Sequence, residues 1–239
     1  MNAPLKRLFD RAEPLFVIFW IVVYCAISLP LRNEAGDESM AMLAGMALVS
    51  LAAMKFVVDN GCMRRYGLSV WPKEPRRFWY FIPLFVLATG NLWGGIRPAY
   101  AGTAQLLAVL SMLLVGFLEE LIFRGFLFKM MLKDGKAKTA VIVSSVTFGL
   151  GHLLNLLSGQ PTLESGIQVC FAIAWGFMFT MVFWKSGSLW PGIIAHGLID
   201  ACSKFAVDDP TLGWVYAGAT ILGALIYCPV LARLKTPET

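Results

Sequence analysis

The sequence predicts an all-α protein of the cell membrane with eight transmembrane helices and both termini in the cytoplasm. Of its 239 residues, 58% are hydrophobic and only 15% are charged, and the mean hydropathy is +0.68. A soluble domain is usually about 45–50% apolar and about 25% charged. Long apolar runs recur along the whole chain, and basic residues gather in alternate connections between them. These observations together indicate a multi-pass membrane protein.

Eight apolar segments approach the length of about 20 residues that a membrane-spanning helix needs. They cover residues 14–31, 40–58, 78–96, 103–131, 139–157, 167–184, 188–205 and 212–232. The fifth and seventh segments are the weakest candidates, because they are short and carry polar residues. Because every connection between the segments is short, we expect a single transmembrane domain over residues 1–239 and no separate soluble domain.

Lysine and arginine set the expected orientation, because cytoplasmic connections are enriched in these residues. With the N-terminus in the cytoplasm, 16 of the 20 basic residues fall in inner segments. Six acidic residues fall in the outer connections: Glu34, Asp37, Glu38, Glu164, Asp208 and Asp209. The net charge of +5 is therefore explained by membrane topology and does not indicate nucleic-acid binding.

The segment GFLEELIFRGFLF, residues 116–128, places three charged residues inside an apolar span. An ionised side chain at the centre of a span costs about 2.5–3.5 kcal/mol on insertion scales, so these charges must pair or face a cavity. Glu120 and Arg124 are four residues apart and can form an ion pair on one helix face. Glu119 is rotated by about 100° from Glu120, so it is not paired in the same way. We expect Glu119 to be the carboxylate that is free for chemistry.

Two other spans carry a polar turn, and together they contain both histidines of the chain. Phe148 and His152 are four residues apart in TFGLGHLLN, and His196 and Asp200 are four residues apart in PGIIAHGLID. Each pair therefore shares one helix face. Three polar turns on separate apolar helices predict that these side chains converge on one site.

A glutamate and two histidines allow two kinds of hydrolytic chemistry. In the first, Glu119 with His152 takes a proton from water, while His196 and Asp200 hold the oxyanion or the substrate carbonyl. In the second, Glu119, His152 and His196 are ligands of a zinc ion with water in the fourth position. The HExxH signature of many zinc proteases is absent, and the five cysteines show no metal-type spacing.

The motifs EELIFR (119–124), FGLGH (148–152) and HGLID (196–200) occur in this order on separate apolar segments. This set resembles the EExxxR, FxxxH and Hxxx(N/D) motifs of the CPBP family. The family comprises CAAX prenyl proteases and bacteriocin-processing proteins, is also called Abi, and includes the Ras-converting CAAX endopeptidase. The resemblance covers about residues 105–205, and the remaining spans resemble the family only in hydropathy and number.

The resemblance implies an eight-helix intramembrane peptidase of the glutamic type. Glu119 and His152 would activate water, and His196 and Asp200 would stabilise the oxyanion. Glu120, Arg124 and Phe148 would support the site. The third motif ends in aspartate, where prenyl proteases often have asparagine, so zinc stays open as an alternative to a reaction without a cofactor.

The expected partners are the lipid bilayer and a membrane-associated peptide or protein substrate. A CAAX-like peptide, a bacteriocin or pheromone precursor, and a protein with a C-terminal sorting tail all fit. Two other functions stay open at this stage: a non-catalytic membrane partner or regulator of the same fold, and a proton-coupled transporter that uses the intramembrane charges.

Overall fold

The computed structural model describes residues 2–72, 81–133, 135–158 and 162–234, and this part of the chain contains helices and no strand. The helices are α1 (Asn2–Arg11), α2 (Glu13–Ala35), α3 (Met40–Asp59), α4 (Ile82–Ala88), η2 (Gly90–Leu92), α5 (Thr103–Glu120), η3 (Leu121–Phe128), α6 (Lys129–Leu132), α7 (Ala137–Gly151), η4 (His152–Ser158), α8 (Thr162–Ser186), α9 (Trp190–Ser203) and α10 (Pro210–Ala232). The predicted all-α fold is confirmed.

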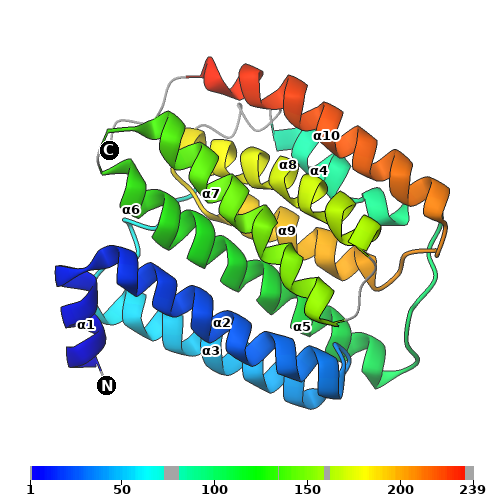
Figure 1. Cartoon of the computed structure of the whole chain (residues 1–239), viewed down its shortest axis with the longest axis horizontal. Helices are drawn as coiled ribbons and strands as arrows, with labels where there is room; N and C mark the ends of the chain where they lie inside the picture. The colour runs from blue at the N-terminus through cyan, green and yellow to red at the C-terminus, as the bar shows by residue number, and fades with distance from the viewer. Residues whose placement is uncertain (1, 73–80, 134, 159–161, 235–239) are drawn as a thin grey trace.

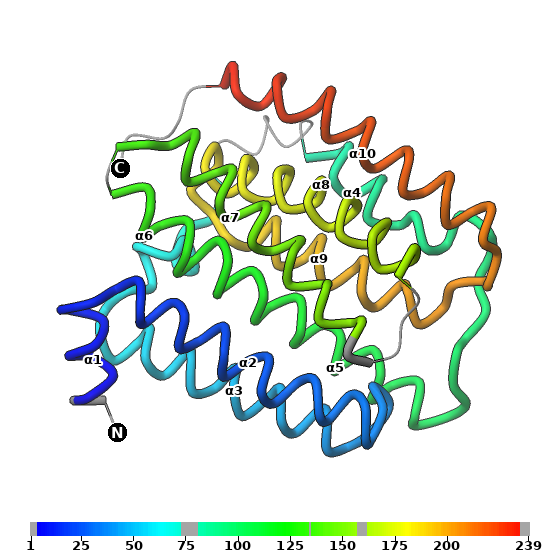
Figure 2. Tube along the Cα trace, viewed as in Figure 1, coloured from blue at the N-terminus to red at the C-terminus, as the bar shows by residue number. Residues whose placement is uncertain are grey.

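The long helices run up and down in succession, so the connections alternate between two ends of the bundle (Figure 1). α1 and the last turn of α10 lie at one end, which we call the terminal end. The connections α2–α3 and α9–α10 lie at the other, which we call the distal end. The Cα trace in Figure 2 shows the same alternation, with the α6–α7 connection at the terminal end.

Six helical segments in the described residues are long and apolar enough to cross a membrane: Glu13–Ala35, Met40–Asp59, Thr103–Leu132, Ala137–Leu156, Thr162–Ser186 and Pro210–Ala232. Large apolar side chains on their outer faces are exposed, among them Leu48, Leu51 and Leu225. A water-soluble protein rarely exposes so many large apolar side chains. The chain is therefore a helical membrane protein.

The other two predicted spans form shorter helices. α9 begins after the turn at Gly187, where φ is +69°, and ends at Ser203. Its 14 residues rise about 21 Å, which is less than the about 30 Å of a bilayer hydrocarbon core. In the span predicted at 78–96, α4 and η2 cover Ile82–Leu92, and residues 78–80 lie outside the described residues.

The helix from Thr103 to Leu132 is the central element of the bundle, and it contains a π-helical stretch, Leu121–Phe128, toward its C-terminal end. The backbone changes from α-helix to π-helix directly after Glu120, and all eight residues of the π-helical stretch are buried. π-Helical turns inside α-helices are rare and are found mostly at functional sites. The glutamate pair of the first motif therefore lies at the one place where this helix departs from α geometry.

Close contact between α5 and α9 depends on two glycines. A Cβ atom at Gly116 would lie 2.8 Å from the backbone nitrogen of Gly197, and one at Gly192 would lie 2.7 Å from Oε2 of Glu120. Small residues let two membrane helices approach to backbone contact. This contact brings the glutamates of α5 to the histidine of α9.

Replacing Gly116 with alanine should therefore push α5 and α9 apart. We expect Gly116→Ala to lower the free energy of unfolding by about 1–3 kcal/mol, the usual cost of overpacking. The matched control is Gly218→Ala on α10, where an added Cβ meets no atom within 4 Å. Thermal unfolding in detergent measures both, and an equal stability of the two variants would contradict the role of Gly116.

Candidate active site

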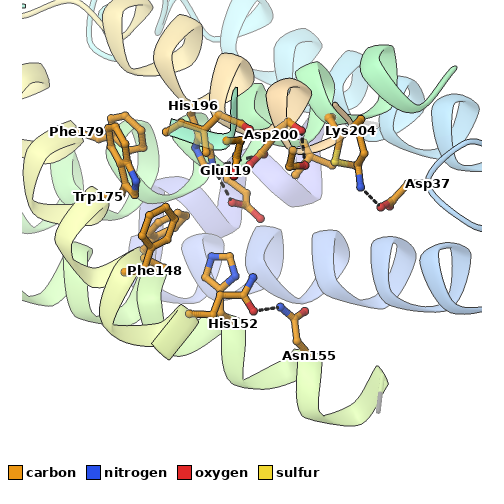
Figure 3. A pocket seen from close by; sticks show the side chains of 18 of the residues that line it. Asp37, Glu119, Phe148, His152, Asn155, Trp175, Phe179, His196, Asp200 and Lys204 are labelled. Carbon is orange, nitrogen blue, oxygen red and sulfur yellow. Dashed lines mark hydrogen bonds and ion pairs between the residues drawn. The ribbon is translucent and has the colours of Figure 1, made fainter. Parts of the chain in front are cut away.

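The sequence-predicted residues converge on one cavity of about 560 Å³ (Figure 3). Glu119, His152, His196 and Asp200 line it together with Phe148. They come from α5, the start of η4, α9 and α7. Glu120 and Arg124 do not line the cavity and are fully buried behind it.

One oxygen of Glu120 connects two of the motifs. Its Oε1 atom lies 2.9 Å from Nη1 of Arg124 on the same helix and 2.9 Å from Nδ1 of His196 on α9. Glu120 and Arg124 have no exposed surface, and the side chain of His196 is 6% exposed. The predicted ion pair is thus present in the structure, but Glu120 also binds the histidine of the third motif, a contact that helical spacing could not predict.

The guanidinium of Arg124 lies between two aromatic rings. It is 4.1 Å from the ring centroid of Phe148 and 5.2 Å from that of Phe179. A buried cation over an aromatic face is stabilised electrostatically by the ring. Phe179 also stacks on the imidazole of His196 at a centroid distance of 5.2 Å. These rings explain how a charge with a single carboxylate partner is kept inside the bundle.

The second nitrogen of His196 points to the carboxylates of the cavity. Its Nε2 atom lies 3.4 Å from Oε2 of Glu119 and 3.6 Å from Oδ2 of Asp200. A hydrogen bond from Nδ1–H to Glu120 leaves Nε2 for these two groups. Glu120 therefore sets which nitrogen of His196 faces the cavity.

Glu119 is not the unpartnered carboxylate that the sequence predicts. The hydroxyl of Tyr24 on α2 donates a hydrogen bond of 2.5 Å to its Oε1 atom. Tyr24 was not among the predicted site residues. The available signal was a tyrosine inside an apolar span, because the hydroxyl of a buried tyrosine usually finds a partner. The side chain of Glu119 is 13% exposed and remains accessible from the cavity.

His152 lies on a different wall of the cavity from Glu119, as Figure 3 shows. Its ring meets the edge of Phe148 at a centroid distance of 5.5 Å, and the ring of Phe148 meets His196 at the same distance. Among the described residues, no direct hydrogen bond joins His152 to Glu119. The expected pair of Glu119 and His152 is thus separated by cavity space, and the direct contact of Glu119 is with His196.

The donor set does not match a preformed metal centre. Within the described residues, no three His, Cys, Asp or Glu side chains are arranged so that they could hold a metal ion. Of the candidate ligands, Glu119 and His196 face each other directly at 3.4 Å, and His152 stands apart from both. We therefore derive no step through a metal.

The distal rim of the cavity is held by a half-buried cluster of ion pairs. Asp37 accepts hydrogen bonds of 2.9 Å from Nε of Arg32 and 2.7 Å from Nζ of Lys204. Burial alone would raise the pKa of Asp37, but the charges of Arg32 and Lys204 outweigh it and hold this pKa below its ordinary value. The cluster ties the α2–α3 connection to the end of α9.

Comparison with known proteins gives one match. The family model of type II CAAX prenyl endopeptidases, Rce1-like, matches residues 101–202, which is somewhat less than half of the chain. The matched segment contains all three motifs and confirms the resemblance seen in them. No curated protein and no solved structure gave a significant match.

The Glu120–Arg124 pair should be a strong determinant of stability. We expect Arg124→Met to lower the free energy of unfolding by about 3–5 kcal/mol, because it leaves a buried carboxylate without its cation. The double variant Arg124→Met/Glu120→Gln removes both charges and should be more stable than the single one. Lys138→Met, at an exposed lysine, is the control. Equal losses in the single and double variants, measured by thermal unfolding, would show that the two charges are not coupled.

Proposed function

Because the family model of Rce1-like type II CAAX prenyl endopeptidases matches residues 101–202, we propose that the chain is a peptidase of this kind and hydrolyses a peptide bond of a membrane-associated substrate. The observation that carries the proposal is the shared cavity of Glu119, His152, His196 and Asp200. A binding partner or regulator without activity has no need for two carboxylates and two imidazoles around one open space.

We propose that Glu119 is the general base. Its carboxylate lines the cavity, and the Tyr24 hydroxyl and the His196 ring fix its position. A water between Glu119 and His152 loses a proton to Glu119 as its oxygen attacks the carbonyl carbon of the substrate. His152, on the other wall, orients this water.

His196 and Asp200 complete the reaction in this proposal. Attack forms a tetrahedral intermediate whose oxyanion needs a hydrogen-bond donor. Nε2 of His196 faces the cavity next to Glu119 and, when protonated, can donate a hydrogen bond to the oxyanion. Asp200 orients the imidazole ring. The carbon–nitrogen bond then breaks as the leaving amine receives the proton that Glu119 took from water. The products are a carboxylic acid and an amine.

The mechanism proposed here is of the glutamic type and uses no cofactor. Glu119 and His196 are close enough to act on each other, and His152 stands apart from them. The alternative that the sequence left open is a zinc ion held by Glu119, His152 and His196. It requires these three side chains to come closer to one another than they are in the structure.

We further propose eight membrane crossings in a single domain, with both termini in the cytoplasm and the chain in the cell membrane. Six long helices support six of the crossings, and the shorter α4 and α9 would provide the other two. The up-and-down order of the helices supports a common side for α1 and the last turn of α10 (Figure 1). The basic residues near this end support the cytoplasm as that side.

Glu119→Gln should abolish cleavage and leave the fold intact. The amide keeps the size and the hydrogen bond from Tyr24 but cannot take a proton, so turnover should fall by about 10²–10⁴-fold. The substrate for the assay comes from comparative proteomics of membranes with and without the chain. The matched control is Glu34→Gln, at an exposed carboxylate that does not line the cavity.

The same assay distinguishes the proposal from its alternatives. Undiminished cleavage by Glu119→Gln at normal abundance would overturn the assignment of Glu119 as the base. Turnover should also survive removal of divalent metals by a chelator, whereas loss of turnover and its recovery with zinc would establish the metal-dependent alternative.

A further inference from the structure

Among the described residues, the cavity is lined by side chains from the middle and the distal end of the bundle and by none of the terminal end. Arg32 comes from the last turn of α2 and Asp37 from the α2–α3 connection. Ser203 and Lys204 come from the end of α9, and Gln168 from the first turns of α8. The described residues of the basic segments 55–72 and 129–138 contribute nothing to the lining. The cavity thus leads from the site toward the distal end.

The bundle is closed between the site and the terminal end. Glu120 and Arg124 are fully buried, and the π-helical turns that follow are buried throughout. Next to them, toward the terminal end, the ring of Phe126 packs against those of Tyr66 and Phe16 at centroid distances of 5.0 Å and 5.2 Å. This aromatic layer leaves the distal end as the route into the site.

A second cavity extends this route. It has a volume of about 700 Å³ and shares Asn91, Gln168 and Phe171 with the first. Its remaining lining includes Trp214 of α10 and Asp208 in the α9–α10 connection. The two cavities thus adjoin each other at these shared residues, near the distal end of the bundle.

From these observations we infer that the site takes its substrate from the extracytoplasmic side of the membrane. Most of the basic residues that the structure describes lie at the terminal end, which therefore faces the cytoplasm. The distal end, with both cavities, then faces the opposite compartment. This inference deepens the proposed protease function and rests on it.

The substrate class follows from this orientation. It is an exported peptide or protein, held in the membrane by an apolar or lipid anchor, whose scissile bond lies at the extracytoplasmic face. Of the three substrate classes that fit the sequence, only substrates whose cleavage site lies on the extracytoplasmic side of the membrane agree with this orientation. A peptide whose cleavage site is presented to the cytoplasm cannot reach Glu119 past the buried layer of the terminal end.

Single cysteines test the route without any substrate. In the full chain with its five native cysteines replaced, Ser203→Cys places a thiol at the mouth of the cavity and Ala172→Cys places one inside it. Lys136→Cys, at an exposed residue of the α6–α7 connection, is the control for the terminal end. A membrane-impermeant maleimide is applied to sealed right-side-out and inside-out vesicles, and to protein in detergent.

We expect the thiols at 203 and 172 to react with the maleimide in right-side-out vesicles and not in inside-out vesicles. The thiol at 136 should react in inside-out vesicles and not in right-side-out vesicles. Reaction of either cavity thiol from the cytoplasmic side, or reaction in detergent alone, would overturn the inference. Activity is measured separately in detergent. Extracytoplasmic labelling combined with unchanged cleavage by Glu119→Gln would leave the orientation standing and reject the proposed function.

Discussion

A single carboxylate oxygen, Oε1 of Glu120, lies 2.9 Å from both Arg124 and His196, and the rest of the site is arranged around it. Burying a charge inside a membrane protein is costly unless the charge is paired. Here the buried carboxylate of Glu120 pairs with the guanidinium of Arg124 on its own helix and contacts the imidazole of His196 on α9. The same contact that stabilises the bundle therefore also orients the histidine of the site.

Several features of the fold make this contact possible. Gly116 and Gly192 allow α5 and α9 to approach closely, and the π-helix begins at the residue after Glu120. Phe148 and Phe179 cover the guanidinium of Arg124, and both rings also touch His196. The second and third motifs thus meet the first through ring contacts as well as through charge. The cavity lies directly beside these buried side chains, and Phe148 and Phe179 form part of its wall.

Local helical spacing predicted much of the site, because residues four apart share a helix face. It predicted the Glu120–Arg124 pair and the separate direction of Glu119. It could not predict contacts between helices, since spacing carries no information about which faces meet. For this reason the hydrogen bond from Tyr24 to Glu119, the approach of His196 to Glu120, and the distance between Glu119 and His152 became visible only in the structure. Hydropathy likewise located α9 but did not reveal how short it is.

The central claim is that Glu120 fixes the ring of His196, so that Nε2 faces Glu119. The chain has only two histidines, so nitrogen NMR of protein labelled at histidine gives two imidazole spectra, and His152→Gln assigns them. The account predicts that Nδ1 of His196 carries a proton, whether the ring is neutral or charged. A neutral His196 with its proton on Nε2 and a bare Nδ1 would contradict it.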